Sequence, residues 1–368
     1  MIDVEKYAAY YWLNKITRGR QQLQEEMRSF YGGIENLWLA GKLDDVDYVA
    51  FLGEKQSEKT DSKAVMREAL ALMKKVSQCG MGVLSRDDEN YPSLLRECRN
   101  GPAVLYYQGK VEMINGCRKR LAVVGSRKCT SYGREMCLKL VSGLDDRNIC
   151  VVSGLARGID AFAHKAALDS DIFTVGVVAS GIDVVYPREN AGLYSRIRES
   201  GVIMSEQPPG TQPLRTYFPA RNRIIAGMAE ATFVVEAGSS SGALITADFA
   251  LDAGRDVMTI PHRIDTPEGA GCNYLIKSGA LCVTSQADVL SALGFETGQE
   301  PGEAELMTEA LDEIQREVFL LIRRNGELVE DEIISETGIS SQEIKRALSA
   351  LEIYGFIKKD FSGKFYAI

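Results

Sequence analysis

The chain has 368 residues, of which 45% are hydrophobic and 26% charged, and its formal net charge is -8. This length suggests two or three domains, and the composition is that of a soluble globular protein. The sequence has no apolar run long enough to cross a bilayer, and its N-terminus lacks the pattern of a signal peptide, so we expect a cytoplasmic protein.

The cysteines and histidines argue against a metal site. The eight cysteines form no C-x-x-C pair, and several lie in apolar runs, so we expect buried free thiols in a reducing compartment. The sequence has two histidines, His164 and His262, which is too few for a histidine-rich zinc or catalytic cluster.

The negative charge is unevenly distributed. Residues 296–336 contain 13 acidic and 3 basic residues, whereas residues 118–134 contain six basic residues and no acidic one. Residues 207–229 also lack an acidic residue. A chain of this kind can bind a polyanion through a local basic surface and stay soluble through its acidic region.

Residues 1–78 have apolar positions at helical spacing and predict a small helical domain. Residues 79–117 read as an irregular connector with short strands at 82–85 and 103–107. From 118 to 295, apolar β-type runs alternate with helical segments; the runs are 121–124, 149–152, 173–179, 202–204, 232–236, 256–260 and 281–284. Nearly continuous apolar strands are buried on both faces, so we predict an α/β domain with a doubly wound, mostly parallel, Rossmann-like sheet. Ligands of such sheets bind at the C-terminal ends of the strands.

The C-terminal part differs in composition. Residues 296–307 are rich in Glu, Gly and Pro and predict a linker. Residues 308–368 follow the order helix, helix, turn, helix and two strands, which predicts a winged helix. Its presumed reading helix, 341–354, offers only Lys345 and Arg346 as basic residues, so contact with a protein is at least as good an interpretation as contact with DNA.

Several strand ends carry loops suited to an anion. The first strand ends in Gly125, Ser126 and Arg127 before a helix that opens at Thr130 and Ser131. Glycine lets the backbone approach a ligand, and the amides at a helix start attract an anion. The alternative is a plain strand-to-helix turn. The nucleotide fingerprint G-x-G-x-x-G and the P-loop are both absent, so we expect no NAD, ATP or other cofactor.

The second strand ends in a loop of the same design, with Ser153, Gly154, Arg157 and Gly158. Asp160 and His164 follow at i, i+4 spacing, and we expect them to interact on one helix face. A structural hydrogen bond explains His164 better than a role as general base, because no partner nucleophile is evident.

Later loops extend the pattern. Arg188 follows Tyr186-Pro187 and is expected on a loop tip. Ser240, Ser241 and Gly242 open a helix after the run 232–236, which is the composition of a phosphate cradle.

The segment 218–223 combines Phe218, Arg221, Asn222 and Arg223 before an apolar helical run. Guanidinium groups bind phosphates bidentately, and an aromatic face accepts a stacked base. The alternative is that Phe218 belongs to the core and that both arginines are solvated or ion-paired.

These motifs together resemble the DprA/Smf family of bacterial DNA-processing proteins over about residues 84–293. The resemblance rests on Asn90-Tyr-Pro, 125–127, 153–160, His164, 180–188, 218–223, 241–247 and 271–276, in this order. The flanking parts are similar to the family's three-part layout, with an N-terminal SAM-like helical domain at 1–78, a Rossmann-like domain at 79–295 and a winged helix at 308–368.

The resemblance implies a protein that is not an enzyme and that binds single-stranded DNA without sequence preference. It implies protection of incoming strands in natural transformation, help in loading a RecA-type recombinase, and a homodimer. The positions matching family DNA contacts are Arg127, Arg188, Phe218, Arg221, Asn222 and Arg223, and Arg215 is a plausible further phosphate contact.

Two other functions remain open at this point. The sheet domain also resembles Rossmann-like nucleoside monophosphate hydrolases, with Arg223, Glu236 and the loop 238–242 in the place of their catalytic groups. Release of free base from a nucleotide, with and without Glu236, would reveal this activity. A winged-helix transcription regulator would bind one duplex sequence specifically.

Overall fold

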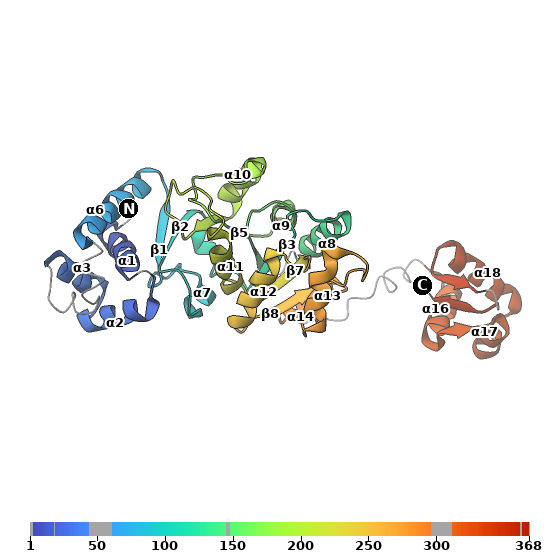
Figure 1. Ribbon diagram of the computed structural model, residues 1–368. Helices are drawn as coiled ribbons and strands as arrows, with labels where there is room; N and C mark the ends of the chain where they lie inside the picture. The colour runs from blue at the N-terminus through green and yellow to red at the C-terminus, as the bar shows by residue number, and fades with distance from the viewer. Residues whose placement is uncertain are drawn as a thin grey trace. The chain divides into compact units, whose positions relative to one another are not determined.

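The computed structural model describes residues 3–17, 19–43, 61–144, 148–295, 311–360 and 363–367. Residues 44–60 of the predicted helical domain and the predicted linker 296–307 lie outside this range. The chain divides into two compact units, Met1–Glu296 and Thr297–Ile368 (Figure 1). The first unit contains both the N-terminal helices and the sheet. None of the described helices is long and apolar enough to cross a membrane.

The N-terminal helices are α1 (Val4–Ile16), α2 (Gln21–Tyr31), α3 (Ile34–Leu43) and α6 (Ser62–Gln78). Asp3 and Asp61 begin α1 and α6 by accepting a hydrogen bond from a backbone amide in the first turn. The buried side chains of α1 and α6, including Trp12 and Met73, share one core with the edge strands of the sheet. The helical prediction for this part is therefore confirmed over the described residues.

Among the described residues of the first unit, nine strands form one sheet in the order β1-β2-β6-β5-β4-β3-β7-β8-β9. The strands are β1 (Gly82–Ser85), β2 (Val104–Gly109), β3 (Lys119–Gly125), β4 (Ile149–Ser153), β5 (Thr174–Val177), β6 (Val202–Ser205), β7 (Ala231–Glu236), β8 (Asp256–Thr259) and β9 (Leu281–Cys282). The pairs β1–β2 and β2–β6 are antiparallel, and every later pair is parallel. The predicted mostly parallel sheet is confirmed.

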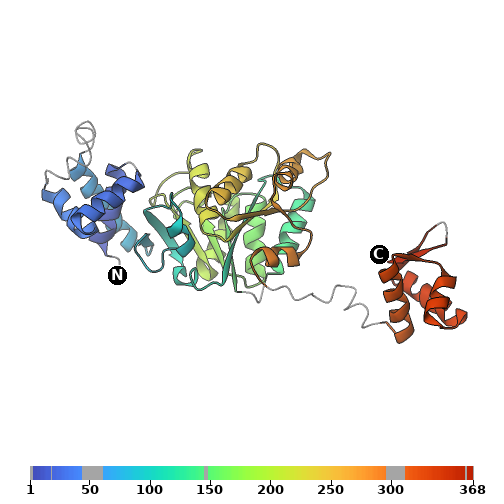
Figure 2. The ribbon, with the colours of Figure 1, turned by 90° about the horizontal axis from the view of Figure 1, so that it is seen from below.

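Helices cover both faces of this sheet (Figure 1, Figure 2). They are α7 (Ser93–Glu97), α8 (Ser131–Ser142), α9 (Ile159–Asp169), α10 (Ala191–Ser200), α11 (Tyr217–Gly227), α12 (Gly242–Asp252), α13 (Ala270–Lys277) and α14 (Gln286–Ala292). Short 3-10 helices lie at Val111–Met113, Arg188–Asn190 and Pro267–Gly269.

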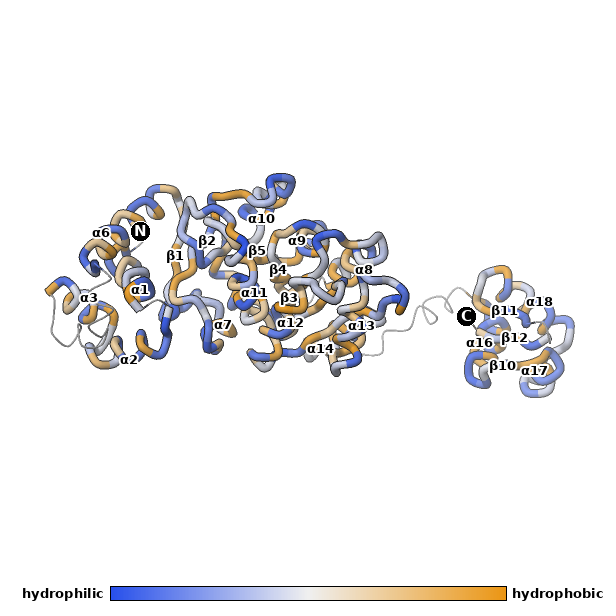
Figure 3. Tube along the Cα trace, viewed as in Figure 1, coloured by the Kyte–Doolittle hydropathy of each residue, from blue (hydrophilic) through white to orange (hydrophobic). Residues whose placement is uncertain are grey.

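The apolar runs are continuous because the side chains of a central strand belong to two hydrophobic cores, one on each face of the sheet. In β3, Leu121 and Val123 belong to the core under α8 and α9, and Ala122 and Val124 belong to the core under α11 and α12. Successive side chains of a strand point to opposite faces, so both faces must be apolar. The hydrophobic colour accordingly concentrates on the central strands in Figure 3.

The second unit contains α16 (Glu313–Asn325), β10 (Glu327–Leu328), α17 (Glu330–Thr337), α18 (Ser341–Ile353), β11 (Ile357–Lys359) and β12 (Phe365–Ala367). The three strands form an antiparallel sheet in the order β10-β12-β11. The helices and the final pair of strands occur in the order that the sequence predicts, and β10 adds a third strand. The unit has its own core, which includes Val318, Ile344 and Phe356.

Candidate nucleic-acid interface

The parallel strands β3, β4, β5 and β7 end at one edge of the sheet, and the loops that follow them lie close together. A surface groove with a volume of about 980 Å³ runs along this edge. It is lined by ten of the predicted residues: Gly125, Ser126, Arg127, Arg215, Phe218, Arg221, Asn222, Ser240, Ser241 and Gly242. Segments separated by more than a hundred residues thus form one surface, at the place expected for a ligand of such a sheet.

Basic side chains dominate the exposed charge of the groove. Arg127, Lys128 and Arg215 are exposed and line it, whereas Glu268 and the buried Asp160 are the acidic residues of the lining. Lys128 was not among the site residues predicted from the sequence. Its position next to Arg127, in a stretch of 17 residues without an acidic one, was the available signal.

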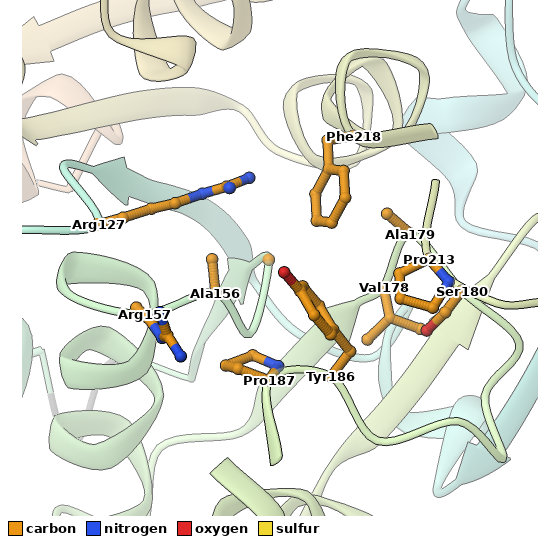
Figure 4. A pocket seen from close by; sticks show the side chains of 11 residues that line it. Arg127, Ala156, Arg157, Val178, Ala179, Ser180, Tyr186, Pro187, Pro213 and Phe218 are labelled. Atoms are coloured by element: carbon orange, nitrogen blue, oxygen red, sulfur yellow. The ribbon is translucent and has the colours of Figure 1, made fainter. Parts of the chain in front are cut away.

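Phe218 lies on the surface of the groove and does not belong to the core. It is in the first turn of α11, where Tyr217 begins the helix, and it is half-buried. Figure 4 shows Phe218 pointing from α11 toward Tyr186, with Arg127 reaching the ring from another side. The guanidinium carbon of Arg127 lies 4.8 Å from the centre of the Phe218 ring, and the Tyr186 ring packs against it at 5.9 Å in an edge-to-face arrangement.

Arg221 differs from the prediction that it contacts phosphate. It is 5% exposed, and its Nη1 donates to the carbonyl of Gly154 at 2.5 Å and to the carbonyl of Val177. Burial lowers its pKa, which the charge of the neighbouring Asp160 opposes. The side chain ties the ends of β4 and β5 together at the inner wall of the groove.

The neighbours of Arg221 on α11 have partners of different kinds. Asn222 Nδ2 donates to the carbonyl of Gly242 at 3.3 Å and so joins α11 to the start of α12. Arg223 forms an ion pair with Glu206 at 2.6 Å and also donates to the carbonyl of Asn100. Arg223 does not line the groove, so this arginine follows the ion-paired alternative.

The loop after β4 is held mainly by close contacts with β3 and the loop that follows it. Ser153 is fully buried, and its hydroxyl donates to the carbonyl of Val123 at 2.6 Å, which joins the ends of β3 and β4. Gly158 has φ +70°, and a Cβ there would lie 2.1 Å from the carbonyl oxygen of Ser126. Only glycine at position 158 lets the loop after β4 approach the loop after β3 this closely. Gly154 and Arg157 line a smaller pocket beside the groove, and Arg157 forms an exposed ion pair with Glu189 at 2.8 Å.

Arg188 lies apart from the groove lining. It is exposed in the 3-10 helix Arg188–Asn190, a short helical turn where a loop tip was predicted. Its neighbours Tyr186 and Pro187 line the smaller pocket beside the groove, together with Arg127 and Phe218.

His164 has a structural role, as the sequence favoured. Its Nδ1 lies 2.7 Å from Oγ1 of Thr174 on β5, so His164 pairs with Thr174 and not with Asp160, the neighbour expected on its own helix. Burial lowers the pKa of His164 to about 3, and the ring is therefore neutral near pH 7. Burial raises the pKa of Asp160, and Arg221 is the main influence that lowers it.

Glu236 fixes the first loop. It is fully buried at the end of β7, and its carboxylate accepts hydrogen bonds from the backbone amide of Thr130 at 3.0 Å and from the Thr130 hydroxyl. Its backbone carbonyl accepts from the amide of Ser126 at 2.7 Å. Glu236 is thus engaged by the loop at Thr130, and Arg223 is paired with Glu206. Among the described residues, no group of three metal-binding side chains comes together.

Comparison with known proteins gives one family. Residues 82–294 match the family model of DNA recombination-mediator protein A. The chain is 34% identical to the putative DNA processing protein DprA of Mycobacterium tuberculosis, with 83% of this chain and 82% of that protein covered. It is 31% identical to protein Smf of Synechocystis, with 95% and 96% covered.

Two solved structures agree with this result. DprA of Streptococcus pneumoniae is similar with a TM-score of 0.67 and 36% identity, covering 78% of this chain and 98% of that one. DNA processing protein A of Helicobacter pylori, whose structure concerns its single-stranded DNA binding mode, is similar with a TM-score of 0.53 and 25% identity, covering 58% and 95%.

Proposed function

The chain belongs to the DNA recombination-mediator protein A family, and we propose that it binds single-stranded DNA along the groove at the strand ends. The observation that carries this proposal is the convergence of Arg127, Lys128 and Arg215 with the half-buried ring of Phe218 on one groove. Cations follow a phosphate backbone, and an exposed aromatic face stacks a base of any kind. In a duplex the faces of the bases are stacked on their neighbours, so no base face is free to stack on the Phe218 ring.

In this proposal each part of the groove has one task. Arg127, Lys128 and Arg215 contact phosphates, and Phe218 stacks one base. The loop Ser240–Gly242 offers its backbone amides at the start of α12, where the side chain of Ser241 caps the helix by accepting from the amide of Ala243 at 3.3 Å. Arg188 lies exposed next to Tyr186 and Pro187 and contacts the strand where it leaves the groove.

The wider role follows from the resemblance. We propose that the protein protects incoming strands in natural transformation, acts as a homodimer and helps to load a RecA-type recombinase. Two grooves in one dimer raise the affinity for a long strand through effective concentration. The C-terminal unit, with few basic residues on α18, contacts a protein in this scheme.

Competition binding tests the proposal. A labelled oligonucleotide of mixed sequence is displaced by unlabelled single strand, duplex and mononucleotide at two salt concentrations. We expect the single strand to compete best and its affinity to fall as salt rises, because phosphate contacts release counterions. Equal competition by duplex, or binding that salt does not change, would contradict the proposal.

A further inference from the structure

A pocket lies between the N-terminal helices and the sheet, where α1 and α2 meet the loop after β1 and the end of α7 (Figure 1). Its volume is about 170 Å³. Among the described residues, its lining has no member in common with the lining of the groove. The pocket is therefore a separate site, and the proposed function gives it no task.

Three arginines determine the charge of this pocket. Arg28 is on α2, Arg86 directly follows β1, and Arg96 is in the last turn of α7. The described lining also contains two carboxylates, Glu25 and Asp87, so three positive and two negative side chains give a formal net charge of +1. Asp87 is already engaged, because Nη2 of Arg28 and a tyrosine hydroxyl both donate to it. The remaining positive charge favours an anion.

The three arginines also keep hydrogen-bond donors that the protein does not use. Nη2 is occupied in each of them. In Arg28 it donates to Asp87, whereas in Arg86 and Arg96 it donates to two backbone carbonyls, the nearer at 2.6 Å and 2.5 Å respectively. Within the part of the chain that the structure describes, Nε and Nη1 of Arg28 and of Arg96 form no hydrogen bond. Nη1 of Arg86 lies 3.9 Å from the Glu25 carboxylate, which is beyond hydrogen-bond distance.

Arg28 has the least satisfied guanidinium group of the three. Its Nε is buried and has no partner among the described residues. An unpaired buried donor is destabilising, and an acceptor within reach relieves this cost. Neighbouring rings hold the guanidinium groups in place, since that of Arg28 lies 5.3 Å from the centre of the Tyr10 ring and that of Arg96 lies 6.0 Å from the centre of the Tyr91 ring. Positively charged groups held in this way lose little freedom when they bind an anion.

The number of guanidinium groups indicates a phosphate. One guanidinium can bind both oxygens of a carboxylate, whereas a phosphate group on a molecule has about two negative charges and three acceptor oxygens, enough for several arginines. One water needs about 10–15 Å³ of such volume, so the pocket has room for roughly 11–17 groups of that size. Inorganic phosphate would fill less than half of it. The site therefore also admits the small molecule that carries the phosphate, with Leu13 and Ala103 as apolar parts of the wall.

We propose that this pocket binds the phosphate group of a small phosphorylated molecule. The inference goes beyond the proposed function, because it needs neither DNA nor any residue of the groove. The ligand contacts Arg28 on the helical side and Arg86 and Arg96 on the side of the sheet. It therefore strengthens the attachment of the N-terminal helices to the sheet, since a ligand that binds only the folded protein stabilises it.

Calorimetric titration with ribose 5-phosphate tests the site at one pH and one ionic strength, and ribose is the control ligand. We expect ribose 5-phosphate to bind and ribose not to bind. Arg28→Gln and Arg96→Gln should each weaken this binding about tenfold or more, because each removes hydrogen bonds to a charged group. Ribose 5-phosphate should raise the melting temperature of the wild type and not that of Arg28→Gln.

Two further variants serve as matched controls with the same change of charge. Arg99 is exposed just beyond α7 and lines neither the pocket nor the groove, whereas Arg215 lines only the groove. Arg99→Gln and Arg215→Gln should bind ribose 5-phosphate within twofold of the wild type. No binding to the wild type at millimolar concentration, or an equal loss in Arg99→Gln, would overturn the inference. A loss in Arg215→Gln as large as that in Arg28→Gln would place the anion in the groove and would also overturn it.

Binding of an oligonucleotide separates this inference from the proposed function. Arg28→Gln should bind single-stranded DNA within twofold of the wild type, and a tenfold loss would assign the pocket to the strand and overturn the inference. Failure of the wild type to bind any single strand would overturn the proposed function and leave this inference intact. Arg96→Gln keeps the test available if Arg28→Gln does not fold, because Arg96 is exposed.

Discussion

Removal of the Phe218 ring tests how base stacking and phosphate contact are connected. In Phe218→Ala the stacked base loses roughly 1–3 kcal/mol, which weakens binding about 5- to 150-fold. The ring also supports Arg127, whose guanidinium carbon lies 4.8 Å from its centre. Such a cation–π contact contributes about 0.5–1 kcal/mol at an exposed site. We therefore expect Arg127 to be less well oriented for phosphate once the ring is gone.

A double-mutant cycle measures this connection. Affinity for one oligonucleotide is measured by anisotropy at several salt concentrations for the wild type, Phe218→Ala, Arg127→Ala and the double variant. Arg127→Ala should flatten the salt dependence by about 0.7 in the logarithmic slope, the value for one contact with a single strand. In the Phe218→Ala background the same substitution should cost about 0.5–1 kcal/mol less than in the wild type. Additivity within about 0.3 kcal/mol would refute the coupling, and loss of folding in Phe218→Ala would return the residue to the core.

Three further outcomes follow from the structure. The pKa of His164 is lowered to about 3 in the folded protein, whereas an unfolded histidine has a pKa of about 6.5. The unfolded chain therefore binds a proton first, so the free energy of unfolding should be unaffected by His164 above about pH 6.5 and should fall as the pH drops below that value. The loss amounts to about 2 kcal/mol at pH 5, and urea titrations of the wild type and His164→Gln should show that the variant lacks this dependence. Arg221→Ala should lower the free energy of unfolding by about 3 kcal/mol, because the carbonyls of Gly154 and Val177 lose their donor and the buried Asp160 loses the nearby positive charge, and the salt slope of DNA binding should not change. A protein ending at residue 295 should bind the same oligonucleotide with an affinity within threefold of that of the full chain. The reason is that the groove lies entirely in the first unit, whereas the truncation removes the acidic region 296–336. A tenfold loss of affinity would place the C-terminal unit in the DNA site.

The sequence was sufficient for the sheet and for the position of the groove. Strands such as β3 are apolar at every position because both faces are buried, and this run is recognisable without a structure. The parallel direction then brings the loops after β3 and β7 to one edge. Gly125–Arg127 and Ser240–Gly242 meet there as predicted.

The sequence was insufficient where the task of a side chain depends on its partners. Glu206 and Asn100 lie far from Arg223 in the chain, so nothing local shows that this arginine is occupied. Tyr186 was seen only as the residue before a proline, because its packing against Phe218 depends on how the loop after β5 meets α11.

The burial of Arg221 could have been predicted from helical spacing. Ile224 and Ile225, both buried, follow it by three and four residues, and residues at this spacing share one face of a helix. Phe218 lies three residues before Arg221 and four before Asn222, and all three residues line the groove, so Arg221 stands where the groove meets the core. The motif therefore divides its residues between two positions, since Arg221 joins the ends of β4 and β5 while the ring of Phe218 lies on the surface of the groove. A guanidinium bonded to the carbonyls of Gly154 and Val177 holds the ends of β4 and β5, so we expect Arg221→Ala to act on the groove through loss of folding stability and not through loss of a phosphate contact.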